Sequence, residues 1–474
     1  MTEQALLSTT ARRPVFSAPF SDWKRALLYM LTLSAVGLSF YPALLLALIL
    51  LINSWRNDRY HFLLQLTILG GGYGLVANNQ FPVHMSDLLF VVAIALVLIL
   101  RKNKMTNRVL WATLGYFVGM MVLAQFSVES MPVQFRLMRK YMLILCFLIP
   151  LLIFQRNDTF QISRFFQVMF TYSLIFCAFY IIDGFILNGW ILLPKTHSVY
   201  HSVFWDPAWA PFSLYFPRKY PPGLYILALC VYPIIYVYRL SWKQWLVVGG
   251  AMAACRTMTV IGGLIATYLL FQRKAKRVVL SMALAIIAMV GLYAIDSAAG
   301  GFLRISSTID QFFTLETAKD VEDLAEFGSN RMAQVIPKME MLYDQRRQWV
   351  GFGFIHPELS KNSAVQLTND LYSDIEQADE NVSNVEVTQV ATILTIGYLG
   401  LILQALYYIA LFFIMKPSRY AKYYLSTIVA FSIFGIGGFG GLNQDTSLLM
   451  IALCIGVVLL QHRQEEKELA LKTE

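Results

Sequence analysis

Arginine residues stand at several positions of this sequence where a fixed positive charge could do chemistry. Arg256 is the most informative of them, because it lies within an apolar stretch that runs from about residue 246 to residue 271. An ionisable side chain at membrane depth is costly and predicts a functional site. Guanidinium binds phosphate through paired hydrogen bonds and stays charged at every physiological pH. The first chemistry to consider is therefore the binding of an anion such as a pyrophosphate.

Further candidate cations occur in segments that we expect on the outer side of a membrane. They are Arg218 in "YFPRKYPPG", Arg331 in "GSNRM", the pair Arg346 and Arg347, and Arg136, Arg139 and Lys140 in "SVESMPVQFRLMRKY". Each has a structural alternative, since an arginine can anchor a helix at the membrane interface, pair with a nearby carboxylate or cover a solvated helix face. For the last segment two explanations stay open: a span count that is wrong by one, or cations that hold an anionic ligand.

The composition places these residues in a membrane protein. Of 474 residues, 57% are hydrophobic and 14% are charged, whereas about a quarter of the residues of a soluble protein are charged. Apolar runs of spanning length recur from residue 26 to residue 460 and do not alternate with polar residues, which favours helices over a β-barrel. We expect an all-α fold, a polytopic transmembrane helical bundle of about 12–14 spans with one large periplasmic loop containing short helices.

Basic residues in short turns predict the orientation of the bundle. Five such turns are expected in the cytoplasm together with both termini: 55–59, 101–104, 239–243, 273–277 and 416–422. Because basic turns flank the block around Arg256 on both sides, this block should cross the membrane as two short arms. Each arm of about 14 residues spans about 21 Å, which is less than the roughly 30 Å of the hydrocarbon core. The turn that carries Arg256 would then lie below the outer surface, in a protein-lined or wet cavity.

Two further segments carry expectations about local structure. The block from residue 26 to residue 53 is interrupted by "SFYP" and is expected to form a second short hairpin. The segment "SNRMAQVIPKMEMLYDQRRQW" has apolar residues at helical spacing, which predicts an amphipathic helix. Three regions follow from these patterns: 1–297 as an N-terminal transmembrane bundle with short helical hairpins, 298–386 as a large periplasmic loop, and 387–474 as C-terminal transmembrane helices with a cytoplasmic tail.

Several classes of function find no support in the sequence. It contains no Walker loop, no Rossmann fingerprint and no G-x-S-x-G elbow. The five cysteines form no C-x-x-C pair and the six histidines are scattered, so we predict no disulfide, no metal site and no cofactor. The net charge of +9 is spread over short basic turns, which indicates topology rather than a patch for nucleic acid.

Four segments, taken in order, carry a resemblance to a known family. They are "FPRKYPPGLYILAL", "CRTMTVIGG", the stretch from Arg331 through "WVGFGF", and "ATILTIGYLGLI". In this order the chain resembles the bacterial O-antigen ligase and polymerase superfamily. Members of that superfamily are integral membrane glycosyltransferases that use glycans linked to undecaprenyl pyrophosphate.

The resemblance assigns roles to individual residues. The ligases carry a histidine followed by asparagine eleven residues before the first glycine of the last segment, whereas this chain has Glu386 at that distance from Gly397. The missing histidine favours polymerisation over ligation, with Glu386 as the catalytic base. Arg256 and Arg331 would stabilise the leaving pyrophosphate. The remaining candidates would bind substrate: Arg136, Arg139, Lys140, Arg218 and His356.

The resemblance therefore implies a polysaccharide polymerase of the bacterial inner membrane with a periplasmic active site. Its partners would be a glycan donor on undecaprenyl pyrophosphate, a glycan acceptor with a free sugar hydroxyl, membrane lipid and a chain-length regulator. An O-antigen ligase, which transfers finished polymer to lipid A core or protein, is the related alternative. A flippase or transporter of lipid-linked sugars is the alternative from another class, although one half of the chain shows no clear repeat of the other.

Overall fold

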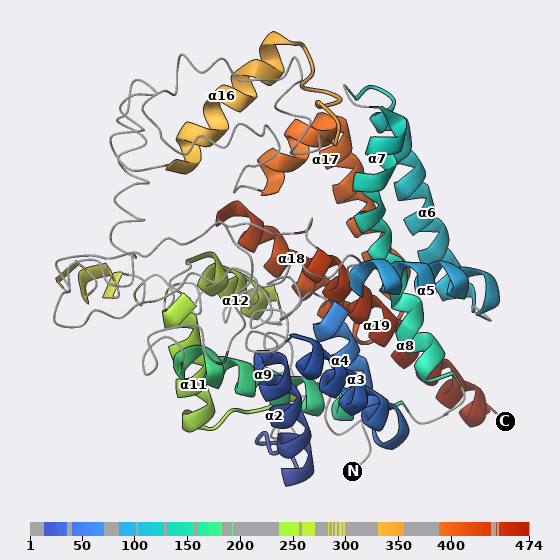
Figure 1. Ribbon diagram of the computed structural model, residues 1–474, viewed down its shortest axis with the longest axis vertical. Helices are drawn as coiled ribbons and strands as arrows, with labels where there is room; N and C mark the ends of the chain where they lie inside the picture. The colour runs from blue at the N-terminus through green and yellow to red at the C-terminus, as the bar shows by residue number, and fades with distance from the viewer. Residues whose placement is uncertain are drawn as a thin grey trace.

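The computed structural model of the protein describes residues 14–35, 40–70, 85–100, 103–127, 130–155, 160–182, 237–255, 258–270, 330–354, 388–437 and 445–473, together with isolated positions. About 85% of the described chain is helical (Figure 1). No strand occurs among these residues, and one isolated parallel bridge pairs Val15 with Arg239. The predicted all-α class is confirmed for this part of the chain.

Four helices in the described part of the chain are long and apolar enough to cross a membrane: α6 (Lys104–Ala124), α9 (Ile162–Ile181), α17 (Thr388–Met415) and α19 (Asp445–Thr473). The helix α5 (Met85–Ile99) is apolar but shorter. These helices support a membrane protein. The expected 12–14 spans extend over residues outside the described part, so their number stays a prediction.

Three short helices follow one another near the start of the described chain: α2 (Phe20–Ala35), α3 (Phe40–Asn57) and α4 (Arg59–Gly70). Helix α2 packs on α3 and on α9, and α3 packs on α4. Pro42 lies in the first turn of α3, where a missing backbone N–H leaves no intrahelical bond unmade. Asp58 separates α3 from α4 and caps α4, because its Oδ1 accepts a hydrogen bond from the Tyr60 N–H at 3.0 Å. The predicted interruption at "SFYP" coincides with the boundary between α2 and α3, because α3 begins at Phe40.

A continuous helical rod crosses the bundle, built from α7 (Met131–Met138), the 3₁₀-helix η1 (Arg139–Phe147) and α8 (Leu148–Ile153). The sequence predicts a span over 141–155 without this change of helix type. A 3₁₀-helix rises about 2.0 Å per residue and an α-helix about 1.5 Å. The nine residues of η1 and the six of α8 therefore reach about 27 Å, close to the hydrocarbon thickness. An all-α segment of this length would reach only about 22 Å.

The remaining helices complete the bundle around this rod: α11 (Trp242–Cys255), α12 (Met258–Leu270), α16 (Asn330–Asp344) and α18 (Ala421–Gly437). Helix α11 packs on α9, α12 packs on α18, and α19 packs on η1 and α8. Helices α6 and α17 run antiparallel. Thr113 bonds the Tyr407 hydroxyl at 3.0 Å, and Phe126, after α6, is bound by Arg347, whose neighbour Gln348 bonds Tyr398 earlier in α17. The two predicted arms around Arg256 correspond to α11 and α12, and Arg256 itself lies outside the described residues.

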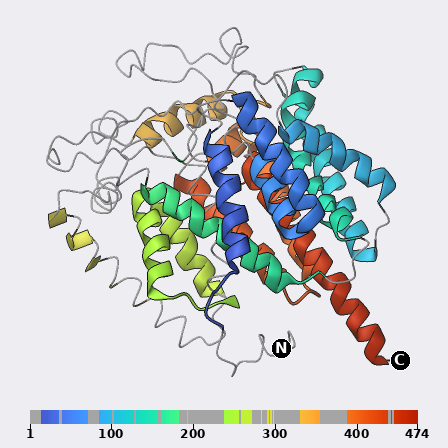
Figure 2. The same cartoon turned by 60° about the horizontal axis from the view of Figure 1, so that its bottom comes forward.

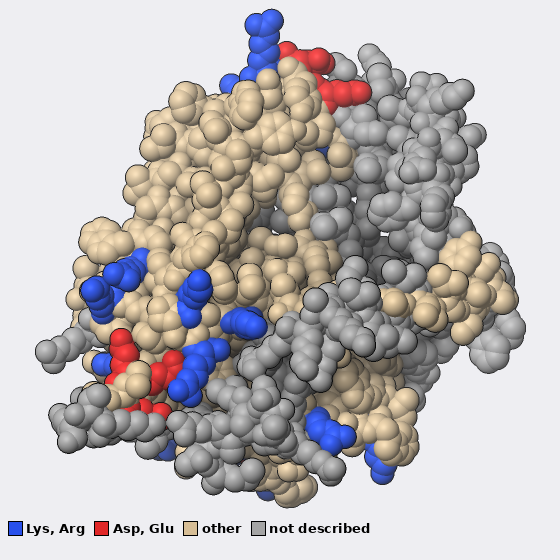
Figure 3. Space-filling model, turned by 180° about the vertical axis from the view of Figure 1, so that it is seen from behind, with Lys and Arg blue, Asp and Glu red and all other residues tan. Residues whose placement is uncertain are grey.

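Three of the predicted cytoplasmic turns gather at one end of the molecule, which we call the basic end: 55–59, 239–243 and 416–422. The contacts that hold them together are those of Arg164 with Asp58, Phe166 with Tyr423, and Arg239 with Phe16. The last turns of α19 project from the same end (Figure 2). There the lysine and arginine side chains lie beside acidic ones (Figure 3). This common placement agrees with the predicted orientation, while its assignment to the cytoplasm stays a prediction.

Candidate functional site

Four of the eight predicted site residues lie outside the described part of the chain: Arg218, Arg256, His356 and Glu386. At Arg136 and Arg331 the structure describes helical backbone, in α7 and in the first turn of α16, without the side chain. Arg139 and Lys140 are described, half-buried, at the start of η1. The Lys140 ammonium lies 5.5 Å from the centre of the Tyr141 ring. The assignment of these cations to one site therefore stays a prediction.

The structure does bring together three segments that the sequence singles out. We call their meeting place the glycine junction and define it as residues 126–127, 130–134, 347–354 and 394–400. It lies at the end opposite the basic end, beside α7 and the C-terminal end of α6 (Figure 1). Residue 127 and residues 130–134 belong to the stretch that breaks the charge rule, and they lie away from the basic end. The choice between an outer cation-bearing segment and a miscounted span stays open.

A break in α17 forms the centre of the glycine junction. Gly397 has a φ of 68°, so the helix changes direction there and two amides lose their helical acceptors. The Tyr398 N–H donates instead to the Gln348 carbonyl at 2.9 Å, and the Leu399 N–H donates to the Trp349 carbonyl at 3.1 Å. Non-helical backbone at membrane depth is tolerated only where protein or water satisfies it. The segment 347–354 supplies that satisfaction for the N–H groups.

The carbonyls freed by the same break are satisfied from the same segment. The Phe352 N–H donates to the Leu394 carbonyl and the Gly353 N–H to the Thr395 carbonyl, each at 2.8 Å. A Cβ at Gly397 would overlap the carbonyl of Trp349. The two segments thus interlock through backbone atoms, with no room for a larger residue. Polar backbone from residues far apart in sequence is held here in one fixed arrangement.

Ser127 and Gln134 close the other side of the glycine junction. Gln134 Nε2 donates to the Phe354 carbonyl at 2.6 Å, and the Phe354 N–H donates back to Gln134 Oε1 at 2.7 Å. Ser127 Oγ donates to the Phe352 carbonyl at 3.1 Å. Gly353, with a φ of 92°, approaches Ser127 so closely that any Cβ would overlap its hydroxyl. Gln134 is fully buried and therefore acts as a backbone mimic rather than as a ligand-facing side chain.

The entry into this turn is set by the end of α16. Arg346 has a φ of 55°, a left-handed conformation that usually falls to glycine, and the Arg347 N–H donates to the Leu342 carbonyl at 2.9 Å. This pattern is a Schellman cap. Arg347 Nη1 then reaches the Phe126 carbonyl at 2.8 Å. The Arg346–Arg347 pair was expected to form a solvated helix face, and Arg347 is instead a partner of the backbone.

Helix α16 rests on the first part of α17 through its own apolar cluster. Leu342 and Phe352 are fully buried against Ile393 and Leu394, apart from the main core of the bundle. The predicted amphipathic helix in the large loop is therefore confirmed. Its apolar face covers the helix break and shields the exchanged backbone bonds from water.

A second cluster, which we call the charged network, lies at the basic end: Asp22, Asp58, His61 and Arg164. Arg164 Nη2 donates to Asp22 Oδ1 and to Asp58 Oδ2, each at 2.8 Å, and its Nη1 also bonds Asp22. Burial would raise the pKa of Asp22, which precedes the apolar stretch of α2. Hydrogen bonds from His61 and Arg164, with the Arg164 charge, instead hold this pKa well below its usual range.

A chain of hydrogen bonds extends the charged network into the bundle. Gln65 Nε2 donates to the Tyr172 hydroxyl at 2.9 Å, the Tyr172 hydroxyl lies 3.1 Å from His61 Nδ1, and His61 Nε2 lies 3.3 Å from Asp22 Oδ1. The Nε2–H tautomer of His61 gives each acceptor in this chain one donor. These hydrogen bonds connect α2, α4 and α9, which indicates a structural role.

The charged network fits a metal site poorly. One ligand atom each from Asp22, Asp58 and His61 lies within 4.8 Å of the others. However, Arg164 already neutralises both carboxylates, and Arg25 lies 3.5 Å from Asp58. A divalent cation would have to displace this guanidinium. This cluster was not predicted from the sequence, although opposite charges at the starts of neighbouring apolar segments are its visible signal.

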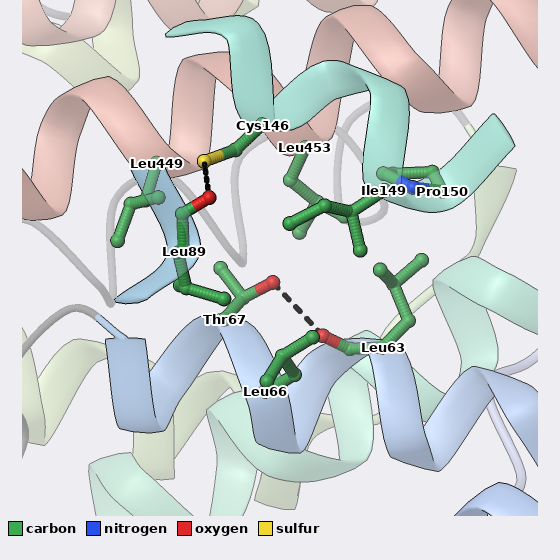
Figure 4. A pocket seen from close by; sticks show the side chains of 9 residues that line it. All are labelled: Leu63, Leu66, Thr67, Leu89, Cys146, Ile149, Pro150, Leu449 and Leu453. Atoms are coloured by element: carbon green, nitrogen blue, oxygen red, sulfur yellow. Dashed lines mark hydrogen bonds between the residues drawn. The ribbon is translucent and has the colours of Figure 1, made fainter. Parts of the chain in front are cut away.

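One small cavity occurs among the described helices (Figure 4). It has a volume of about 20 Å³ and is lined mainly by aliphatic side chains of α4, α5, α8 and α19. Its polar atoms are already used, since Thr67 donates to the Leu63 carbonyl at 2.8 Å and Cys146 to the Leu89 carbonyl at 3.7 Å. A space of this size holds about one water molecule. It cannot admit a sugar or a lipid headgroup.

The sequence matches no protein-family model and no curated relative. Its function has to be argued from the residues and their arrangement, in which the glycine junction is the feature that unites the most distant segments.

Proposed function

We propose that the protein is an inner-membrane polysaccharide polymerase that acts on the periplasmic side. It transfers a glycan from undecaprenyl pyrophosphate to a sugar hydroxyl of a second lipid-linked repeat. The observation that supports this proposal most is the glycine junction. Two of the four segments that carry the family resemblance, the G-x-G turn and the Gly397 break, interlock there, next to the cation-bearing start of η1.

In the proposed reaction the acceptor hydroxyl attacks the anomeric carbon of the donor sugar. The new carbon–oxygen bond forms as the bond to pyrophosphate breaks, and the hydroxyl proton passes to the Glu386 carboxylate. Undecaprenyl pyrophosphate leaves with its electron pair, and Arg256 and Arg331 stabilise the added charge. Arg136, Arg139, Lys140 and Arg218 bind the lipid-linked pyrophosphate, and His356 contacts the substrate. The reaction balances without a metal or cofactor.

The orientation of α16 gives a reason to place Arg331 and Glu386 in one site. Tyr343 bonds Tyr398 through their hydroxyls at 2.6 Å, and Val335 and Val390 belong to the same apolar cluster, so α16 runs in the same direction as the first part of α17 (Figure 1). Since the two helices pack together and run in the same direction, the first turn of α16, which holds Arg331, and the start of α17, which Glu386 precedes in sequence by two positions, lie toward the same side.

The proposal is tested with purified full-length protein in liposomes and lipid-linked repeats as the substrate, with polymer length read on gels. Removing one strong transition-state contact lowers the rate by about a hundredfold. We expect losses of this size in Arg256→Ala and Arg331→Ala, with incomplete rescue by lysine because lysine lacks the paired donors. Glu386→Gln should lower the rate by about 10²–10⁴. Arg108→Ala, an exposed arginine on α6, is the matched control and should keep full activity.

The cell-surface glycan of a deletion strain separates polymerisation from the alternatives. A polymerase leaves single capped repeats, whereas a ligase leaves full-length polymer that is not attached. Full polymer formation by Arg256→Ala at normal expression would contradict the proposed role of this residue. Near-normal turnover in Glu386→Gln would leave that carboxylate as a helix-capping group and remove it from the mechanism.

A further inference from the structure

Three aromatic side chains converge on the surface beside the glycine junction, and we call them the aromatic trio: Tyr343, Trp349 and Tyr398. Trp349 is 56% exposed and Tyr343 is 49% exposed. The Trp349 and Tyr398 rings lie 6.0 Å apart at an angle of 67°, and the two tyrosine hydroxyls are 2.6 Å apart. The trio therefore presents ring faces and a hydroxyl pair to the same side of the molecule.

The aromatic trio is held in place by the backbone rather than by side-chain packing alone. Tyr398 follows the Gly397 break, and its N–H bonds the residue before Trp349. The Trp349 carbonyl accepts from the residue after Tyr398. Tyr343 lies in the last turn of α16, whose Schellman cap fixes the chain leading to Trp349. Large aromatic side chains with few rotatable bonds on rigid backbone lose little entropy when they bind a ligand.

The position of the trio relative to α17 places it at a membrane interface. Beyond Tyr398 this helix exposes an apolar stripe at helical spacing: Leu399, Ile402, Leu406, Ile409 and Phe413. The stripe is about 21 Å long at 1.5 Å per residue. Lys416, over the Phe413 ring, marks its other end. A group bound by the trio would lie just outside the hydrocarbon, where the first sugars of a lipid-linked glycan are found.

The chemistry of the trio fits a neutral, hydroxylated ligand. No member is charged, and of the charges next to it in sequence Asp344 and Arg346 are of opposite sign while the Arg347 guanidinium is bound to the Phe126 carbonyl. A pyranose ring has an apolar C–H face that packs on indole and phenol rings, and hydroxyl edges that match the tyrosine hydroxyl pair. We propose that the aromatic trio is a saccharide-binding platform that holds a pyranose of the glycan chain. The choice of ligand rests on the proposed function.

The competing explanation is that these residues belong to an aromatic belt at the membrane surface. Belt residues act independently and meet lipid headgroups one by one. In the trio the two hydroxyls bond each other, and all three residues come from segments joined at the glycine junction. A belt residue is available as a matched control on another helix, because Trp111 of α6 is 71% exposed.

The test measures binding by calorimetry with the full-length protein in nanodiscs. The first probe is the repeat oligosaccharide that mild acid releases from the lipid-linked repeats of the source cells, and the second is inorganic pyrophosphate. Trp349→Ala should weaken oligosaccharide binding by about tenfold or more, since truncation of an aromatic anchor commonly has effects of this size. The double variant Tyr343→Phe/Tyr398→Phe, which keeps both rings, should weaken it by about fivefold. Neither variant should change pyrophosphate binding, and Trp111→Ala should change nothing.

The outcomes separate the platform from the reaction. Unchanged oligosaccharide affinity in Trp349→Ala, or no oligosaccharide binding by the wild type, would overturn the platform. An equal loss for both probes together with a lower melting temperature would also overturn it, since that result indicates a packing role. If the wild type binds the oligosaccharide through Trp349 yet forms no polymer from lipid-linked repeats, the proposed reaction fails while the platform stands.

Discussion

Arg164 is the residue whose loss should cost the most stability at the basic end. It neutralises Asp22 and Asp58, and Asp22 is only 1% exposed. Arg164→Leu removes the shared partner of the buried Asp22 and the half-buried Asp58, with only His61 left beside Asp22 and Arg25 beside Asp58, and breaking such a pair costs about 3 kcal/mol. We expect a clear fall in the melting temperature of the protein in detergent, measured by scanning fluorimetry.

Arg25 provides the control for that substitution. Its guanidinium lies 3.5 Å from Asp58, and its side chain is 36% exposed. Exposed pairs of this kind contribute about 0–1 kcal/mol. Arg25→Ala should therefore leave the melting temperature almost unchanged. Equal shifts in melting temperature in Arg25→Ala and Arg164→Leu would show that burial does not determine how much each ion pair of the charged network stabilises the protein.

The lowered pKa of Asp22 gives stability at the basic end a defined dependence on pH. A carboxyl whose pKa is lower in the folded state stabilises that state above its ordinary pKa of about 4. This contribution is lost as the pH falls from that value through the folded pKa. The difference in melting temperature between wild type and Asp22→Asn should therefore be constant near neutral pH and shrink below about pH 4.

At the scale of elements, the break in α17 depends on a single glycine. Gly397 combines a left-handed φ with contact to the Trp349 backbone, so Gly397→Ala cannot be accommodated by a moving side chain. We expect a loss of about 2–3 kcal/mol, from the strained φ and from separation of the two segments. The measurement is limited proteolysis within residues 345–354, which should become faster.

Gly115 on α6 is the matched control for this prediction. A Cβ there would meet nothing within 4 Å, and the residue is in the middle of a helix. Gly115→Ala should be neutral or stabilising by about 0.5–1 kcal/mol. If residues 345–354 resist proteolysis equally in Gly397→Ala and Gly115→Ala, the interlocked backbone hydrogen bonds are not what holds the glycine junction together.

The sequence predicts the helices well where one physical signal dominates. Long apolar runs indicate α5, α6, α17, α18 and α19, and the spacing of apolar residues indicates α16. The 3₁₀ form of η1 leaves no such signal, because apolar residues fill the segment on every side. The bend at Gly397 is equally hidden, since a glycine in an apolar run is usually part of a straight helix. Only contacts from residues 347–354 make that position a break.

The candidate site, too, could be predicted from the sequence only in part. The motifs at 349–354 and 397–400 were identified from the sequence, and the structure brings them together. Their partners Ser127 and Gln134 could not be foreseen, because an uncharged side chain that bonds only backbone has no recognisable spacing. The charged network was missed for another reason: its charges are split among three segments that meet only after folding.

At the scale of the whole molecule, the two ends should lie on opposite sides of the membrane. Ser130, near the glycine junction, and Glu466, on the projecting part of α19, are both exposed. In a chain with its own cysteines replaced, Ser130→Cys should react with an impermeant maleimide on intact spheroplasts. Glu466→Cys should react only after the membrane is opened. Labelling of both from the same side would contradict the proposed topology and the periplasmic reaction with it.

The interlocked glycine junction also has a consequence for the order in which the protein assembles during synthesis. The charged network is complete once Tyr172 has left the ribosome, so the basic end can close early. The glycine junction needs Tyr398 and Leu399, which are made much later. Until then the carbonyls of Gln348 and Trp349 lack the donors that they have in the folded protein, and hydrocarbon cannot supply any. This turn must therefore stay in water until Tyr398 and Leu399 reach the membrane surface. The arrival of these two residues is the step that completes the fold.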